Sequence, residues 1–246
     1  MINDFKSLFN LNSSITNNDL VVGLSGGPDS MFLLFYIKHL KEQFGFLRSV
    51  FPIIVDHGLR IESNNEALKA KQIAAKLGFD SKIIKIKDKY TSGNLQNWAR
   101  IRRRDILYNV AKKHSADIVL GHQYDDQIET IYMRLMKSSG FDGLIGIKEV
   151  TKWKEIKVLR PLLKIKKKEI LNFLSRKKIP YVTDKSNFDY KFERVKSRKF
   201  LNLLKKNEFC NIENNLYKLS TISKRFTKSL NEFENIWKID NVNYYS

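Results

Sequence analysis

Cysteine is nearly absent from this chain of 246 residues, because Cys210 is the only one. A single cysteine forms no disulfide within the chain and no CxxC pair for zinc, an iron–sulfur cluster or a thiol relay. Long apolar runs are absent too, since no segment approaches the about 18 residues of a membrane span. The N-terminus lacks a basic region followed by an apolar stretch of signal-peptide length. We therefore expect a cytoplasmic protein that does not contact a membrane.

Acidic residues are few beside the basic ones. The chain has 45 Lys and Arg against 26 Asp and Glu, which gives a net charge of +19. Between Lys152 and Lys206, 19 basic residues stand against 5 acidic ones, so most of the excess lies in one segment. A uniform compositional bias would have spread this charge, and the segment therefore favours a polyanionic partner such as nucleic acid. The alternative is a set of solvated helix faces.

The first two thirds of the chain alternate short β-rich runs with helical periodicity, which is typical of a parallel sheet with helices on both faces. The length fits one such α/β domain, expected at residues 1–200, and a smaller helical appendage at 201–246. The predicted strands are Leu20–Leu24, Val50–Val55, Ser81–Ile86 and Asp117–Leu120, and the predicted helices are Ser30–Phe44, Ser63–Leu77, Leu95–His114 and Asp125–Met136.

The end of the chain carries a repeating apolar pattern. From Phe209 to Trp237, apolar residues recur in steps of three and four. This spacing predicts one or two amphipathic helices, and the expected role of the apolar stripe is packing.

A glycine-rich loop, SGGPDS at Ser25–Ser30, joins the first predicted strand to the first predicted helix. These are the parts of a phosphate-binding loop, because backbone amides and the helix dipole face the anion. Gly26 and Gly27 let the backbone come close to it. A Walker A loop would need GxxxxGK followed by Ser or Thr, and this loop has no lysine. The loop is therefore a different nucleotide-binding device, and the alternative is a plain turn capped by Ser30.

Polar blocks follow the second and fourth predicted strands, where the ligands of parallel sheets bind. DHGLR occupies residues 56–60, and GHQYDDQIET occupies Gly121–Thr130. Asp125 and Asp126 open a helix, where the dipole favours carboxylates, and Glu129 lies one turn later on about the same face. Such carboxylates can reach Mg²⁺ directly or through water. A helix cap would explain one of these acids but hardly the whole cluster.

The string SGGxDS resembles the signature of the PP-loop ATP pyrophosphatases, which cleave ATP between its α- and β-phosphates. The loop alone would also suit NAD synthetase or GMP synthetase. Six blocks in one order resemble a narrower family, the tRNA(Ile)-lysidine synthases. They span residues 20 to about 200 and are SGGPDS, VDHGLR at Val55–Arg60, NWAR with residues 101–104, GHQYDDQIET, RPLL at Arg160–Leu163 and DKSNFDYKFERVKSR at Asp184–Arg198.

This resemblance implies a Rossmann-like fold with a parallel five-stranded sheet and a small C-terminal helical appendage that contacts tRNA or packs. It implies a ligase that uses ATP and Mg²⁺ to adenylate C2 of the wobble cytidine in tRNA(Ile) with a CAU anticodon. The ε-amino group of L-lysine then displaces AMP, and the product is lysidine. The oligomeric state is open, and a homodimer is compatible with the sequence.

The resemblance also implies roles for individual residues. The expected ATP-binding residues are Ser25, Gly26, Gly27, Pro28, Asp29, Ser30, Asp56 and His57. The expected catalytic residues are Asp29, Asp125, Asp126, Glu129, Arg194 and Arg198, with Asp29 and Asp126 as the leading carboxylates for Mg²⁺ or lysine. The expected contacts to tRNA or other substrate are Arg60, Arg100, Arg103, Arg104, His122, Gln127, Lys166, Lys167 and Lys168.

Several of these residues have structural alternatives. Arg194 and Arg198 lie one turn apart on a predicted helix, so they either face phosphates and the activated base or pair with Asp189 or Glu193 on the surface. The histidines after the second and fourth strands are either substrate contacts or ordinary loop residues. The arginines from position 100 to 104 either meet RNA or lie on an exposed helix without a partner.

The chain departs from the family pattern at two positions. Gln123 stands where a second histidine commonly follows, and Val195 stands where an asparagine commonly follows the arginine. An imidazole role therefore does not carry over to Gln123, although its amide can still form hydrogen bonds. The chain is also short for a family whose members often carry further C-terminal domains.

Two other functions remain open at the level of sequence. A PP-loop tRNA thiolase also adenylates a base oxygen but delivers sulfur, and Cys210 alone argues against a self-contained sulfur relay. Such an enzyme would need an external sulfur donor. The second alternative is a basic RNA-binding protein with a degenerate nucleotide fold and no chemistry, which the intact loop and the acid cluster disfavour.

Overall fold

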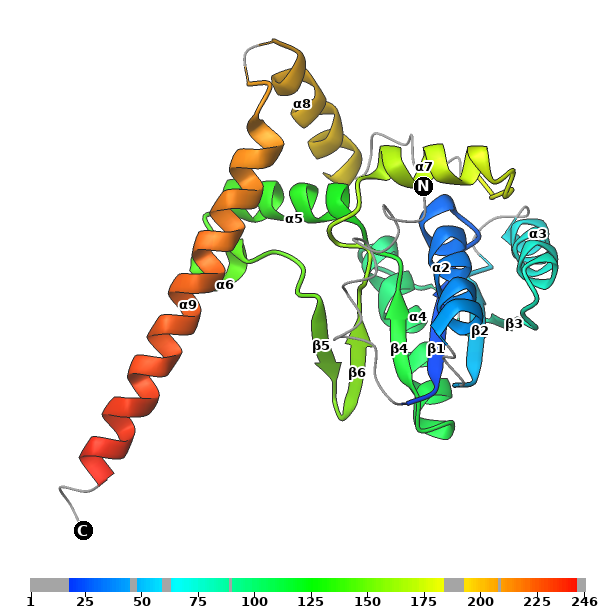
Figure 1. Cartoon of the computed structure of the whole chain (residues 1–246), viewed down its shortest axis with the longest axis horizontal. Helices are drawn as coiled ribbons and strands as arrows, with labels where there is room; N and C mark the ends of the chain where they lie inside the picture. The colour runs from blue at the N-terminus through cyan, green and yellow to red at the C-terminus, as the bar shows by residue number, and fades with distance from the viewer. Residues whose placement is uncertain are drawn as a thin grey trace. The chain divides into compact units, whose positions relative to one another are not determined.

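The computed structural model describes residues 18–44, 48–58, 63–88, 90–183, 193–207 and 209–242. The chain forms two compact units (Figure 1). The first, called the sheet unit, contains residues 1–124 and 149–184, and the second, called the helical unit, contains residues 125–148 and 185–246. Within the described ranges, no helix is long and apolar enough to cross a membrane.

The sheet unit is built on six strands in the order β3-β2-β1-β4-β6-β5. Every neighbouring pair is parallel except β5 and β6, which run antiparallel. The strands are β1 (Leu20–Leu24), β2 (Val50–Asp56), β3 (Lys82–Lys85), β4 (Asp117–Leu120), β5 (Val150–Trp153) and β6 (Ile156–Leu159). The predicted α/β class and parallel sheet are confirmed, and the four predicted strands agree with the structure to within one residue at each end.

The expected count of five strands is corrected to six. The additional strand is β5, which forms a hairpin with β6 at the edge of the sheet. Its turn contains Lys154, whose φ of 54° lies in the left-handed region. The segment VTKWKEIKVL alternates between apolar and polar residues on both sides of the turn, which is typical of paired strands. The many lysines of this segment obscure the alternation in the sequence.

Helices cover both faces of the sheet. On one face lie α2 (Pro28–Phe44), α3 (Ser63–Lys76) and α7 (Lys167–Arg176), which share a core with Leu20, Val22 and Leu24 of β1. On the other face lies α4 (Leu95–Lys113), which shares a core with Val21 of β1. Alternate residues of β1 therefore enter opposite cores, as expected for a strand buried on both sides.

The strand order reverses between β1 and β4. From β1 the chain builds β2 and β3 toward one edge, and β4 is then added on the other side of β1. The carboxyl ends of β1 and β4 thus form a topological switch point, where open α/β sheets bind ligands. The residues that follow these ends are Ser25 and Gly121.

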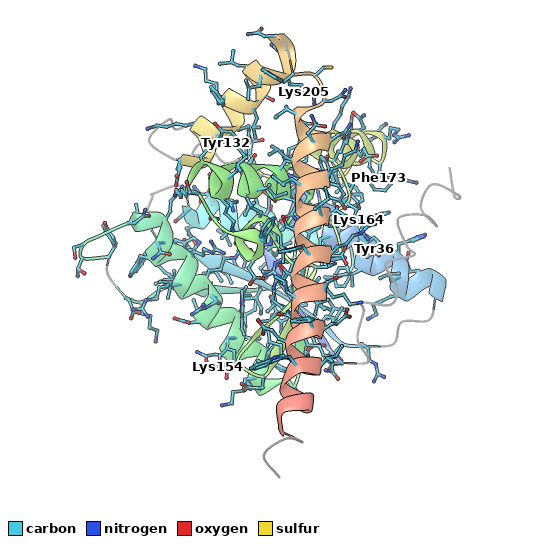
Figure 2. The ribbon with its side chains drawn as sticks, turned by 90° about the vertical axis from the view of Figure 1, so that its left-hand side faces the viewer. Tyr36, Tyr132, Lys154, Lys164, Phe173 and Lys205 are labelled. Carbon is cyan, nitrogen blue, oxygen red and sulfur yellow. The ribbon has the colours of Figure 1, made fainter. Side chains whose placement is uncertain are left out.

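The helical unit consists of α5 (Tyr124–Met136), α6 (Phe141–Leu144), α8 (Glu193–Asn207) and α9 (Ile212–Val242). Tyr132 of α5, labelled in Figure 2, packs against Phe200 of α8 with ring centroids 5.8 Å apart. The apolar stripe, which predicted one or two amphipathic helices, lies mostly on the single helix α9. Its stripe is only partly buried, because Leu216 is 4% exposed whereas Phe233 is 66% exposed.

Candidate active site

The loop Ser25–Ser30 is held in shape by its own hydroxyl groups. Ser30 Oγ donates to the carbonyl oxygen of Gly27 over 2.9 Å, and the hydroxyl oxygens of Ser25 and Ser30 lie 3.2 Å apart. Gly26 has a φ of +82°, which residues with a Cβ rarely adopt. Gly26 therefore permits a backbone path that the two serines stabilise.

Neighbouring segments press on the loop from two sides. The amide of Val182 donates to the carbonyl oxygen of Gly26 over 2.9 Å, and a Cβ at Gly26 would lie 2.9 Å from Cβ of Ala70. A Cβ at Gly121 would lie 3.2 Å from the carbonyl oxygen of Asp29. At Gly27, by contrast, the nearest atom to such a Cβ is Ser25 Oγ at 3.5 Å. The loop is thus tightly packed around Gly26, whereas a Cβ at Gly27 would make only an ordinary contact within the loop.

Asp29 on the first turn of α2 forms an ion pair with Lys167 on the first turn of α7. Lys167 Nζ lies 2.6 Å from Asp29 Oδ2, and the two side chains are about one third and one quarter exposed. Lys166 takes a different position, with Nζ 5.5 Å from the ring centroid of Tyr124, and Lys168 is exposed. The three lysines expected to contact tRNA therefore have different surroundings, and Lys167 pairs with a residue of the glycine loop.

The end of β2 contributes Asp56 and His57. Asp56 is buried, and its Oδ1 accepts a hydrogen bond from the amide of Gly58 over 2.9 Å. Burial lowers the pKa of His57, the positive charge of Arg103 lowers it further, and Asp56 acts in the opposite direction. The Nδ1 atom of His57 is buried without a hydrogen-bond partner among the described residues. His57 is therefore a neutral imidazole near pH 7.

Three arginines gather on the side of the sheet that α4 covers. They are Arg100 and Arg103 of α4 and Arg160, which follows β6. Burial lowers the pKa of Arg160 to about 10, and Arg100 contributes to this shift. Burial and Arg100 likewise lower the pKa of Arg103. Mutual repulsion of like charges would be relieved by a polyanion, so this group, the arginine cluster, is suited to bind phosphates.

The arginine cluster lies close to β1. The Arg103 Nη2 atom lies 3.2 Å from the position that a Cβ on Gly23 would take. Arg160 Nη1 donates to Thr151 Oγ1 over 2.9 Å. Arg104 lies apart from these contacts, with its guanidinium 5.9 Å from the ring centroid of Trp153. Of the predicted arginines on α4, Arg100 and Arg103 thus belong to the cluster and Arg104 does not.

In the helical unit, the acids of α5 pair with the arginines of α8. Arg198 Nε lies 2.7 Å from Glu129 Oε1, and Arg194 Nη1 lies 3.8 Å from Asp126 Oδ1. Burial raises the pKa of Glu129, whose side chain is 3% exposed, and Arg198 opposes this shift. The structure thus joins four of the predicted catalytic residues in two ion pairs.

The alternative partners of these arginines have other positions. Glu193, on the same helix as Arg194 and Arg198, pairs with Lys137 over 2.7 Å instead. Asp189 lies outside the described residues, as does Arg60, the predicted tRNA contact after β2.

Gln127 is buried in the helical unit, where α5, α9 and the segment after α6 meet. Its Nε2 donates to the carbonyl oxygen of Ile145 over 2.9 Å, and its Oε1 accepts from the amide of Ile147 over 2.5 Å. Ser220 of α9 donates to the same Ile145 oxygen over 2.7 Å. These bonds give Gln127 a structural role within the helical unit. Its expected contact with tRNA or other substrate stays a prediction.

The remaining acids and histidines do not form a preformed metal cage. His122 is half-buried and Gln123 is buried, both at the end of β4. Among the described residues, no three side chains of His, Cys, Asp or Glu converge in a way that could hold a metal ion. The predicted pairing of Asp29 and Asp126 as metal ligands stays a prediction.

Three residues described above, Gly121 and Val182 at the loop and Arg160 in the arginine cluster, were not among the predicted site residues. Gly121 and Arg160 stand in sequence blocks noted above, beside the acids, histidines and arginines that were predicted. Val182 holds Gly26 through a backbone amide, which any residue except proline can supply, so no side-chain signal marks it.

Comparison with known proteins identifies close sequence relatives. The PP-loop domain family matches residues 2–204. The tRNA(Ile)-lysidine synthase of Mycoplasma mycoides subsp. mycoides SC is 33% identical over 238 residues, which cover 96% of this chain and 54% of that protein. The tRNA(Ile)-lysidine synthase of Thermosipho africanus is 32% identical over 231 residues, covering 91% and 49% respectively. The chain spans about half the length of the curated relatives it matches.

A solved structure has the same fold. The U34-tRNA thiolase NcsA from Methanococcus maripaludis, with its [4Fe-4S] cluster, superposes with a TM-score of 0.73. The match covers 89% of this chain and 78% of the thiolase at 19% sequence identity. At this identity the similarity concerns the fold alone.

We predict that the pKa of His57 lies below its usual 6.5 and rises in an Arg103→Gln variant, because that substitution removes a positive charge that disfavours the imidazolium. The measurement is an NMR titration of the histidine resonances. Arg104→Gln is the matched control and should leave the His57 titration unchanged. If the His57 pKa did not change in Arg103→Gln, or changed equally in Arg104→Gln, the arrangement described would be contradicted.

We predict that Arg198→Ala lowers the free energy of unfolding by about 2 kcal/mol at neutral pH, because it leaves the buried Glu129 carboxylate without its partner. The folded-state pKa of Glu129 is already raised and would rise further. The penalty relative to the unchanged chain therefore grows as pH rises through the folded-state pKa of Glu129, and it shrinks at acidic pH, where the buried carboxyl is protonated in both proteins.

Denaturant unfolding at several pH values measures this effect. Lys137→Ala breaks an exposed ion pair in the same unit and is the matched control, with an expected cost of about 0.5 kcal/mol. Equal costs for both variants at neutral pH would show that Glu129 does not depend on Arg198.

Proposed function

Because the chain belongs to the PP-loop domain family, we propose that it cleaves ATP between the α- and β-phosphates and transfers AMP to the wobble cytidine of tRNA(Ile). The ε-amino group of L-lysine then displaces AMP, and lysidine results. The observation that carries this proposal is the glycine loop at the switch point, which is tightly packed at Gly26 and less crowded at Gly27. The names of the curated relatives support the choice of substrates.

The loop is suited to the phosphates of ATP. The loop leads directly into the first turn of α2, and the partial positive charge at a helix N-terminus favours an anion. Ser25 and Ser30 supply hydroxyl groups, and Asp56 and His57 at the end of β2 are proposed to contact the nucleoside. In this family the chemistry is cleavage at the α-phosphate, so the loop is proposed to hold the pyrophosphate that leaves.

Asp29 fits a magnesium ion that accompanies ATP. Mg²⁺ usually keeps several waters and takes one or two protein carboxylates together with phosphate oxygens. One carboxylate at the loop meets that demand, and a cage of three acids is not required. A bound Mg²⁺ would neutralise charge on the triphosphate, and Asp29 would orient it.

The arginine cluster is proposed to receive the RNA. Burial lowers the pKa values of Arg103 and Arg160, and the charge of Arg100 lowers both further, so RNA phosphates near this cluster would stabilise its charge. The basic segment from Lys152 to Lys206 would extend this attraction along the tRNA, and residues 201–246 are proposed to contact tRNA or pack. A neutral His57 beside Arg103 can accept a hydrogen bond from a nucleotide.

The acids of α5 are proposed to hold the ammonium group of lysine. Asp125 and Asp126 stand on the first turn of α5 and are half-buried. Arg194 and Arg198 pair with Asp126 and Glu129 and orient their carboxylates. An incoming ammonium group would compete with a guanidinium contact of 3.8 Å at Asp126, which is long and therefore weak.

A tRNA thiolase is the competing assignment. The fold match to NcsA supports the architecture and says nothing of sulfur in this chain. Iron–sulfur clusters are usually held by three or four cysteine thiolates, and this chain has one cysteine. If this chain were a thiolase, it would therefore need sulfur from another protein. The names of the relatives favour lysidine synthesis.

The test is incorporation of radioactive lysine into an unmodified tRNA(Ile) transcript with a CAU anticodon. We predict that the full chain with ATP and Mg²⁺ attaches lysine to this RNA and releases one pyrophosphate for each lysine attached. Asp29→Ala should abolish both while RNA affinity stays within about twofold, because the carboxylate serves the nucleotide and not the RNA.

Asp80→Ala removes an exposed acid of the same unit and is the matched control, with unchanged incorporation expected. Pyrophosphate release without lysine on the RNA would end the lysidine assignment and favour another acceptor such as sulfide. ATP binding without any RNA-dependent pyrophosphate would favour an RNA-binding protein without chemistry.

A further inference from the structure

We propose that Lys167 is the phosphate-binding lysine that the glycine loop itself lacks. On this proposal, which rests on the proposed use of ATP, Lys167 Nζ leaves Asp29 when ATP binds and contacts the oxygens of the β- and γ-phosphates. The loop reads SGGPDS and contains no lysine, whereas a Walker A loop ends in a lysine that performs this task. Here a helix almost 140 residues further along the chain brings the ammonium group to the loop.

The position of Lys167 supports this role. Its Nζ lies 2.6 Å from the carboxylate of Asp29, which is itself a residue of the loop. The ammonium group thus already sits at the edge of the space where phosphates would bind. A lysine side chain has four flexible methylene bonds, so a shift of a few ångströms between neighbouring oxygens needs no backbone movement.

The helix that carries Lys167 is firmly attached to the helix that carries Asp29. Phe173 of α7, labelled in Figure 2, packs against Phe32 and Phe35 of α2 with ring centroids 5.2 and 5.1 Å apart. The first turn of α7 is fixed as well, because Glu169 Oε2 accepts from the amide of Lys166 over 2.8 Å. The backbones of α2 and α7 are therefore fixed relative to one another, and only the side chain of Lys167 needs to move from Asp29 to the phosphates.

Electrostatics explains why the ion pair would exchange partners. An ionised Asp29 beside the loop repels phosphate, and Lys167 cancels that charge while the loop holds no nucleotide. When ATP arrives with Mg²⁺, the carboxylate gains a divalent cation and the ammonium group gains phosphate oxygens. Both are charge-assisted contacts, so one ion pair is replaced by two favourable interactions.

The same position helps the departure of pyrophosphate. In the proposed transfer, the bond between the α-phosphorus and the bridging oxygen breaks while the cytidine O2 bonds to phosphorus. The bridging oxygen keeps the electron pair and leaves as part of pyrophosphate. An ammonium group on the β- and γ-phosphates stabilises this added charge, and positively charged side chains that do so accelerate phosphate chemistry.

The experiment measures ATP and AMP binding to the full chain by calorimetry, without RNA or lysine, so that no turnover occurs. We predict that Lys167→Gln weakens ATP binding about tenfold or more, because a charge-assisted contact is lost. AMP, which has no β- or γ-phosphate, should bind within about twofold of the unchanged chain. Lys167→Arg should restore most of the preference for ATP. Lys177→Gln removes a charge from the other end of the same helix and should change neither affinity.

A second variant separates phosphate binding from a structural role of the ion pair. In magnesium-free buffer, Asp29→Asn removes the partner of Lys167 but leaves the lysine, so the preference for ATP over AMP should persist. An equal loss in Asp29→Asn and Lys167→Gln would show that the ion pair only stabilises the loop, and the proposal would be wrong. An unchanged ATP preference in Lys167→Gln would also overturn it.

The outcome for the unchanged chain tests the proposed function separately. If the unchanged chain binds ATP no better than AMP, the proposed use of ATP fails, whatever the variants show. If it prefers ATP and Lys167→Gln keeps that preference, the proposed function stands and only the role of Lys167 falls. Thermal unfolding of each variant verifies that lost binding is not lost folding.

Discussion

The contact between the glycine loop and its neighbours is the constraint on which the candidate active site depends. Gly26 has a φ of +82° and leaves no space for a Cβ, because Ala70 and Val182 press against it. The sheet places this point between β1 and β4, where the strand order reverses. The phosphate site is therefore a property of packing as much as of the motif, and the motif is what makes such packing possible.

Charge is arranged differently in the three groups of candidate residues. The acids at the loop and on α5 each have a cationic partner, Lys167 for Asp29 and Arg198 for Glu129. The arginine cluster instead brings cations close to one another. Burial lowers the pKa values of Arg103 and Arg160, and the charge of Arg100 lowers both further. Acids with a cationic partner suit a site that takes up a cation or an amine, and a group of neighbouring arginines suits one that takes up a polyanion.

Much of the fold follows from the sequence because strands and helices leave clear periodic signals. The strand Leu20–Leu24 and the glycine loop after it were predictable in position and in type. The hairpin of β5 and β6 was not, because lysines on its exposed positions mask a short alternation. The partners within the site were also out of reach: Lys167 meets Asp29 across 138 residues, and Val182 acts through its backbone. Residue type indicates what a side chain can bind, whereas packing decides what it meets.

The central claim is that the glycine loop directs cleavage of ATP at the α-phosphate and transfer of AMP to RNA. The most direct measurement incubates the chain with unmodified tRNA(Ile) transcript and ATP labelled at either the α- or the γ-phosphate, with lysine omitted. The account predicts that label from the α-phosphate appears on the RNA as an AMP adduct, and that label from the γ-phosphate appears in free pyrophosphate. Label from the γ-phosphate on the RNA, or its release as inorganic phosphate, would contradict the account.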